Sequence, residues 1–181
     1  MAEDNFEGMP LTQAVRTWLD GEGWDDENEV HADRTVSSVA TSITISDQSF
    51  RLYLEVFESD ERLFVYFYST YNVPRQRVEV ALRIINRINL RLAFGRLAFQ
   101  DDGEGRPIQF KVSVDVEGSA LSPVQVNTLV GLGVVTFRNY GNVLAAACLT
   151  KRTVDDLWAD FLVDEEDRDP SSGCPVLRVL N

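Results

Sequence analysis

Two neighbouring stretches with the pattern of β-strands restrict the fold of this chain more than any other feature of its sequence. The first spans residues 50–57, where apolar and polar side chains alternate, and the second spans residues 63–71, which are rich in aromatic and β-branched side chains. The alternating apolar positions of the first stretch are Phe50, Leu52, Leu54 and Val56. Ser59-Asp60-Glu61 lies between the two stretches, so we predict a hairpin in an antiparallel sheet.

A second hairpin is predicted over residues 96–100 and 108–117, which flank the turn-forming sequence Asp-Asp-Gly-Glu-Gly-Arg-Pro. The alternating apolar positions of the longer stretch are Phe110, Val112, Val114 and Val116. Residues 36–45 contain mainly Ser, Thr and Val, which suits a strand with one face in water. Strands therefore account for much of the middle of the chain.

The clearest helix is predicted to begin at Pro74 and to end at Gly95. Apolar residues recur along it every three or four positions, and we expect the face that they form to pack on the sheet. This face consists of Val78, Ala81, Leu82, Ile85, Ile88 and Leu92. Replacement of Leu82 or Ile85 by Ala is therefore expected to cost about 2–5 kcal/mol of stability.

Three further helices are indicated by apolar periodicity together with start and stop signals. The first begins at Pro10 and ends at the glycines of residues 21–23. The second begins at Pro123, inside the capping-box sequence Ser-Pro-Val-Gln of residues 122–125. The third follows Thr153, which precedes an aspartate by three positions in a second cap signal.

The order of these elements predicts an α+β fold, an antiparallel β-sheet with helices packed on one face. It differs from the strict alternation of strand and helix that is typical of a parallel sheet. Residues 10–163 are long enough to form a single domain with its own core. Residues 1–9 are expected to be a flexible N-terminus, and residues 164–181, which are acidic and then rich in Pro, Ser and Gly, a mobile tail.

Net charge and targeting signals limit which partners and which cellular compartment we expect for this chain. The chain carries 17 Lys and Arg against 29 Asp and Glu, a net charge of −12, so nucleic acid and anionic membranes are not expected partners. Its first residues are acidic where a signal peptide would be basic, and no stretch is apolar enough to span a bilayer. We expect a cytoplasmic protein in which Cys148 and Cys174 stay reduced.

Candidate chemical sites are few. His31 is the only histidine, and we interpret it as a surface or strand-edge residue because a metal site or a nucleophile needs further groups nearby. The carboxylates of residues 25–29 and 101–104 lack the spacing of a calcium-binding loop. Gly131-Leu132-Gly133 falls inside a predicted helix, where small residues permit close packing. We therefore expect no catalytic residue, metal or cofactor.

One basic feature stands out in this acidic chain. Residues 75–96 contain six arginines and one glutamate, a local net charge of +5. Arg83, Arg87 and Arg91 are spaced by four and are expected to form one ridge along the helix. Guanidinium groups at this spacing suit the carboxylates of an acidic protein partner or of a second copy of this chain in a homodimer. The alternative is a solvated face that is neutralised by the chain's own acidic loops.

Five short sequences between residues 71 and 144 occur in an informative order. They are Tyr-Asn-Val-Pro at 71–74, Ile-Asn-Arg-Ile-Asn at 85–89, Ala-Phe-Gly-Arg-Leu at 93–97, Val-Asp-Val-Glu-Gly at 114–118 and Leu-Ser-Pro at 121–123. Together they resemble the YbjN family of bacterial proteins, described as sensory transduction regulators, over roughly residues 10–148. The resemblance implies a fold similar to type III secretion chaperones and a role in binding proteins, with no catalytic residues to transfer. The acidic tail and the helix after residue 150 depart from the family.

The leading hypothesis is a non-enzymatic, cytoplasmic protein-binding module of a bacterium, either chaperone-like or a regulatory adaptor. The alternative is a small-molecule sensor with an apolar pocket between the aromatic strand at residues 64–68 and the helices. A closed cavity would favour the sensor, and a filled core would count against it. A hydrolase that uses the carboxylates of residues 25–29 is the least favoured hypothesis.

Overall fold

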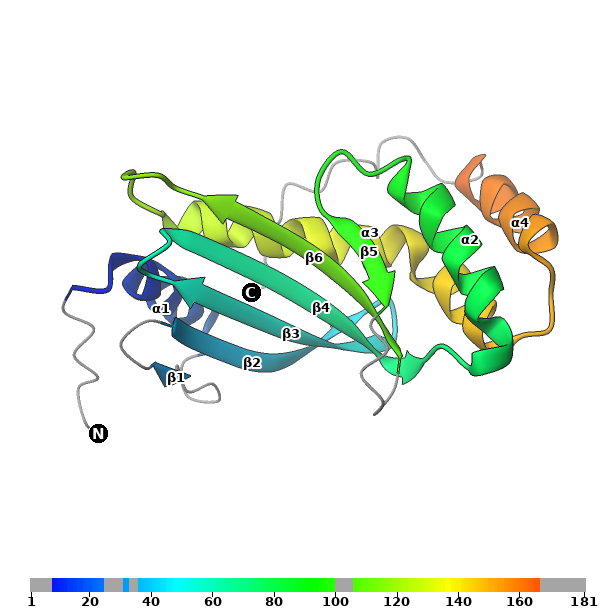
Figure 1. Ribbon diagram of the computed structural model, residues 1–181, viewed down its shortest axis with the longest axis horizontal. Coiled ribbons are helices and arrows are strands. Elements are labelled where there is room, and N and C mark those ends of the chain that lie inside the picture. The colour runs from blue at the N-terminus through cyan, green and yellow to red at the C-terminus, as the bar shows by residue number, and fades with distance from the viewer. Residues whose placement is uncertain (1–7, 25–30, 33–35, 100–105, 167–181) are drawn as a thin grey trace.

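The computed structural model describes residues 8–24, 31–32, 36–99 and 106–166 (Figure 1). Their six strands form one antiparallel sheet in the order β1-β2-β3-β4-β6-β5. The strands are β1 (His31–Ala32), β2 (Val36–Ile45), β3 (Gln48–Phe57), β4 (Arg62–Asn72), β5 (Arg96–Phe99) and β6 (Pro107–Asp115). Both predicted hairpins are confirmed, because β3 pairs with β4 and β5 pairs with β6.

The helices lie on one side of this sheet (Figure 1). They are α1 (Pro10–Glu22), α2 (Val78–Asn89), α3 (Pro123–Leu149) and α4 (Val154–Glu166). The helices α1 and α3 run behind the strands, α2 contacts β5 and α3 at one end, and α4 contacts α2 and α3. Within the described residues, the opposite face of the sheet carries no helix. The predicted α+β fold, with helices on one face of an antiparallel sheet, is confirmed.

The core lies between the sheet and α3. Phe67 of β4 is fully buried, and its ring centroid lies 6.4 Å from that of Phe110 in β6 and 6.1 Å from that of Phe137 in α3. Phe137 also packs on Phe50 of β3, at 4.2 Å between centroids. A Cβ at Gly133 would lie 2.1 Å from Cε2 of Phe67. The missing side chain at residue 133 therefore lets α3 approach the sheet, as the packing interpretation predicts.

The first helix is capped by a residue from a distant part of the chain. Its N-cap, Met9, makes no side-chain hydrogen bond to the helix. The carboxylate of Glu58, which follows β3, instead accepts hydrogen bonds from the backbone N–H groups of Leu11 (3.3 Å) and Thr12 (2.7 Å). A negative charge at a helix N-terminus also interacts favourably with the helix dipole. Glu58 therefore fastens α1 to the hairpin of β3 and β4.

The helix α2 differs from its prediction in both its end and its buried face. It is preceded by a 3-10 turn at Arg75–Arg77 and ends at Asn89 rather than near Gly95. Its buried residues are Ala81, Ile84, Ile85 and Ile88. Leu82 is 43% exposed, so the prediction that it packs on the sheet is wrong. An α-helix turns by roughly 100° per residue, which places Leu82 at the margin of the face centred on Ala81.

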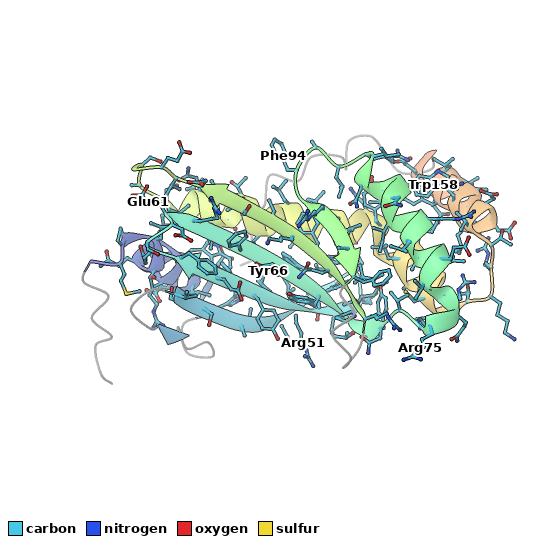
Figure 2. The ribbon with its side chains drawn as sticks, viewed as in Figure 1. Arg51, Glu61, Tyr66, Arg75, Phe94 and Trp158 are labelled. Carbon is cyan, nitrogen blue, oxygen red and sulfur yellow. The ribbon has the colours of Figure 1, made fainter. Side chains whose placement is uncertain are left out.

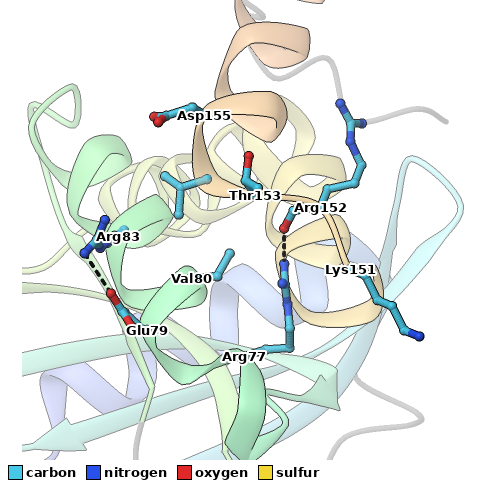
Figure 3. Close-up of a pocket in the computed structure, with 9 residues that line it drawn as sticks. Arg77, Glu79, Val80, Arg83, Lys151, Arg152, Thr153 and Asp155 are labelled. Carbon is cyan, nitrogen blue, oxygen red and sulfur yellow. Dashed lines mark hydrogen bonds and ion pairs between the residues drawn. The ribbon is translucent and has the colours of Figure 1, made fainter.

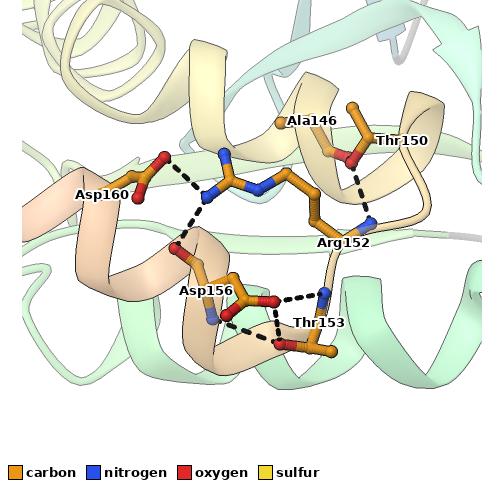
Figure 4. Close-up of polar contacts among 6 residues, drawn as sticks. All are labelled: Ala146, Thr150, Arg152, Thr153, Asp156 and Asp160. Atoms are coloured by element: carbon orange, nitrogen blue, oxygen red, sulfur yellow. Dashed lines mark hydrogen bonds and ion pairs between the residues drawn. The ribbon is translucent and has the colours of Figure 1, made fainter.

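The predicted cap signals of the last two helices are confirmed. The Ser122 hydroxyl accepts a hydrogen bond from the backbone N–H of Gln125, whose side chain accepts one from the backbone N–H of Ser122. The Thr153 hydroxyl and the Asp156 carboxylate form the equivalent pair at the start of α4 (Figure 4). This helix continues to Glu166, three residues into the segment expected to be a tail.

The structure describes only some of the residues on which the remaining sequence predictions rest. Cys148 is 3% exposed at the end of α3, and burial raises the pKa of its thiol to about 11. The backbone of His31 lies in β1, at an edge of the sheet opposite Ser38. Cys174, residues 167–181 and the carboxylates of residues 25–29 and 101–104 lie outside the described residues.

Candidate functional site

Aromatic side chains line the face of the sheet that no described helix covers. Because side chains alternate along a strand, the residues that flank buried Val65 and Phe67 in β4 point to this open face. Its aromatic residues, each partly exposed, are Tyr53, Phe57, Phe64, Tyr66 and Tyr68. Phe64, Tyr66 and Tyr68 stack in a row, with successive ring centroids 6.0 and 6.2 Å apart. We call these five residues the aromatic face; Tyr66 lies near its centre (Figure 2).

Cationic side chains accompany the aromatic face. The Lys111 ammonium of β6 lies 4.1 Å from the ring centroid of Phe64 and 5.1 Å from that of Tyr66, within the range of cation–π attraction. Arg62 lies over Phe64 at 5.9 Å and pairs with Asp115 at 2.6 Å. Burial and, to a lesser extent, the nearby Glu55 carboxylate raise the pKa of Tyr66 to about 12, so its hydroxyl stays protonated at neutral pH.

The interior side of the same strand is filled by side chains. Val65 and Phe67 are fully buried, and Phe67 lies in ring contact with Phe110 and Phe137. Phe64, Tyr66 and Tyr68 point away from the helices and cannot line a pocket beneath them. This filled core counts against the predicted sensor pocket between residues 64–68 and the helices.

The structure divides the three arginines of the predicted ridge between two environments. Arg83 is 64% exposed and pairs with Glu79 of its own helix at 2.7 Å. Arg87 donates to Asp155 of α4 at 2.7 Å, and Arg91 donates to both carboxylate oxygens of Glu165 at 2.7 Å. Arg91 lies two residues beyond the end of α2 yet reaches the same helix as Arg87.

Aromatic side chains of α4 complete the contact with these arginines. The guanidinium carbons of Arg87 and Arg91 lie 5.7 and 5.8 Å from the ring centroid of Trp158, and Arg91 lies 5.5 Å from that of Phe161. Phe161 also packs on Tyr140 of α3, at 5.3 Å between centroids. Acidic and aromatic residues of one short helix therefore contact the basic end of α2.

Two surface hollows lie beside α4. One, of about 320 Å³, lies between α2 and the connection from α3 to α4, and Val80, Arg83 and Asp155 are among its lining residues (Figure 3). The other, of about 140 Å³, lies between α3 and α4. Arg77 tethers the connection by donating to the carbonyl oxygens of Ala147 and Arg152, both at 2.8 Å.

Sequence reasoning missed the aromatic face and the position of α4. Both alternating sets of residues 63–68 are apolar or aromatic, so their pattern does not reveal which set faces water. One signal for the position of α4 was present in the sequence. The acidic residues of α4 complement the charge of the arginines in residues 75–96, which could have suggested that the two segments meet. Contact between the two segments depends on tertiary packing.

The antiparallel sheet with helices on one side places this chain among small α+β proteins. Its aromatic face gives it an exposed surface of the kind that binds other molecules. The family model described as "Putative bacterial sensory transduction regulator" matches residues 12–146. The chain belongs to the YbjN family. A search of curated proteins gives no match.

Solved structures with a similar fold share 14% sequence identity with this chain. YbjN from E. coli, titled "a putative transcription regulator", has a TM-score of 0.52 over 74% of this chain and 93% of that chain. The HopA1-SchA chaperone-effector complex gives a TM-score of 0.43, with coverages of 74% and 94%, and the ExsC-ExsE complex 0.42, with 72% and 95%.

Two further findings concern the described part of the chain. None of the helices in this part is both long enough and apolar enough to span a bilayer. Among the same residues, no group of three or more His, Cys, Asp or Glu side chains has the arrangement of a metal site.

Proposed function

We propose that this chain is a non-enzymatic, cytoplasmic protein of a bacterium that binds a protein partner, as a chaperone-like protein or a regulatory adaptor. The observation that carries the proposal is the aromatic face. A solvent-exposed row of aromatic rings is typical of an interaction surface, because aromatic side chains contribute much of the binding free energy in protein interfaces. Membership of the YbjN family supports a regulatory role.

The chemistry of the open face favours an extended protein segment that combines apolar with acidic side chains. Among the described strand residues, four cations share this face with two carboxylates according to the strand register: Arg51, Arg62, Arg96 and Lys111 with Glu55 and Asp115. The face is thus positive in a chain whose net charge is −12. Apolar side chains of the segment would pack on the rings while its carboxylates approach the cations. The high negative charge of the whole chain disfavours nucleic acid at the same surface.

Site-directed photo-crosslinking tests this proposal. A benzophenone amino acid replaces Tyr66 in the full chain, and the same replacement at Thr17, exposed on α1, serves as the control. A protein captured from native cell extract only through position 66 is then purified and titrated against the unmodified chain. We expect saturable binding that weakens at least tenfold with Phe64→Ser or Tyr66→Ser and stays unchanged with Thr17→Ala.

The variants must remain folded for this comparison, because cross-strand aromatic pairs also contribute about 0.2–1 kcal/mol each to stability. Thermal unfolding followed by circular dichroism checks this. Equal binding by the wild type and both aromatic variants would contradict the proposed surface. Tight binding of a single-stranded oligonucleotide in place of a protein would contradict the proposed class of partner.

A further inference from the structure

The helix α4 is an addition to the part of the chain shared with the family. The family match ends at residue 146, inside α3, and α4 begins at Val154. Most of the hydrophobic core precedes α4 in the sequence, and α4 adds Leu157 and Phe161 at its edge. The helix α4, which lies outside the matched residues, therefore packs on α2 and on α3, most of which lie within them.

Contacts between α4 and the surface of α2 and α3 combine partly exposed ion pairs with a small buried stripe. Asp155 is 89% exposed in its pair with Arg87, and ion pairs at such exposure contribute little to stability. Among the described side chains of α4, Leu157 and Phe161 are the buried ones, and both belong to the hydrophobic core. Hollows of about 320 and 140 Å³ beside the helix leave its packing incomplete on both sides. The helix α4 therefore holds to the molecule by two buried side chains and by ion pairs that are at least partly exposed.

The helix α4 also shows which chemistry fits this surface. Its contacting residues are Asp155, Leu157, Trp158, Phe161 and Glu165. They combine two carboxylates for the arginines with an apolar and aromatic stripe for Tyr140. Arg83 lies beyond this contact, pairs with Glu79 of its own helix and lines the larger hollow.

We propose that the surface formed by Arg87, Arg91 and Tyr140 is a second docking site, and that its ligand is an acidic, aromatic amphipathic helix of a partner protein. The helix α4 is the chain's own occupant of this site, and the partner helix displaces it. This inference rests on the proposed protein-binding function and names a class of partner for a surface distinct from the aromatic face. The tether keeps α4 at a high effective concentration, so a free helix competes at a disadvantage.

A labelled synthetic peptide of residues 151–166 is the probe, and its binding to the full-length chain is measured by fluorescence anisotropy. We expect weak binding to the wild type. Weakening the chain's own α4 with Asp155→Asn, Trp158→Ala and Glu165→Gln should improve the affinity for the peptide at least tenfold. Adding Arg87→Gln and Arg91→Gln to that variant should abolish the gain.

Two matched controls accompany this test. Arg83→Gln makes the same chemical change on the same helix, at an arginine that pairs with Glu79, and should leave the affinity for this peptide unchanged. A peptide carrying Asp155→Asn and Glu165→Gln should bind the variant with weakened α4 at least tenfold more weakly than the native peptide does, because it lacks both carboxylates that pair with Arg87 and Arg91. Equal affinity for all variants or both peptides would overturn the proposal.

Hydrogen exchange of the wild-type chain provides a measurement that needs no variant. We expect the amides of α4 to exchange faster than the buried amides of α3, because α4 detaches without global unfolding. Equal protection of both helices would overturn the proposal, as would a dimer that exchanges α4 between two copies. The two experiments separate the two proposals. If position 66 captures no protein but the peptide binds as expected, only the proposed function is rejected. If position 66 captures a protein but the peptide does not bind as expected, only this inference is rejected.

Discussion

Gly133 sets the distance between α3 and the sheet. We expect Gly133→Ala to destabilise the chain by about 1–3 kcal/mol, because the new Cβ would lie 2.1 Å from the fully buried ring of Phe67. Gly21→Ala is the control, since Gly21 lies in α1 with open space around it, and Ala should stabilise that helix by roughly 0.5–1 kcal/mol. Urea unfolding measures both changes, and equal values would show that the sheet yields to the extra methyl group.

The reactivity of the Cys148 thiol reports whether the C-terminal end of α3 is buried. Burial raises the pKa of its thiol to about 11, so the reactive thiolate is scarce at pH 8. In a Cys174→Ser background, we expect a disulfide reagent to leave Cys148 unmodified in the native chain and to react within minutes after denaturation. The reaction in the native chain should accelerate as pH rises towards 11. Rapid modification at pH 8 without denaturant would contradict this prediction.

Among elements, α2 offers the sharpest test of helical phase. We expect Ile84→Ala and Ile85→Ala each to cost about 2–5 kcal/mol, because both side chains are buried beneath the helix. Leu82→Ala should cost less than about 1 kcal/mol, since Leu82 is 43% exposed. Chemical denaturation of the three variants gives the comparison, and a Leu82 cost equal to that of Ile85 would mean that the helix is rotated.

The capping of α1 by Glu58 is a second test at this scale. We expect Glu58→Ala to cost about 1–2 kcal/mol, because two backbone N–H groups of α1 lose their acceptor. The Thr12 hydroxyl also donates to Glu58 at 2.7 Å and, having one hydrogen, must accept from Ser37. Asp60→Ala, an exposed change in the same loop, is the control for lost charge. The same unfolding midpoint for both variants would argue against the cap.

For the whole molecule, the charge and the Pro, Ser and Gly content of residues 167–181 predict a segment that is dispensable for folding. We therefore propose that a chain ending at Glu166 keeps the thermal midpoint of the full-length chain. A chain ending at Val163 should lose the pair between Arg91 and Glu165 and release α4 more readily, while the midpoint of global unfolding changes little. Circular dichroism gives the midpoints and hydrogen exchange the release. A large fall in the midpoint on removal of residues 167–181 would show that this segment contributes to the core.

Local patterns in the sequence were sufficient for most elements and for their start signals. The strand at residues 36–45 and the caps at Ser122 and Thr153 agree with the structure, because alternation and cap chemistry are encoded within a few neighbouring residues. The order of the elements was sufficient to predict helices on one face of the sheet, and five short sequences were sufficient to predict the family.

Tertiary structure decided the features that depend on which surfaces meet. Glu58 caps a helix that begins nearly fifty residues earlier, and no local pattern pairs two such positions. Leu82 lies at the margin of its helix, where the extent of the opposing surface determines burial. Phe64 and Phe67 are equally apolar, and only the placement of α3 buries Phe67 and leaves Phe64 on the open face. The sequence alone determined where the acidic and basic segments lie along the chain. Packing determined that α4 covers two of the three arginines, because side chains far apart in the chain meet only after the core has formed.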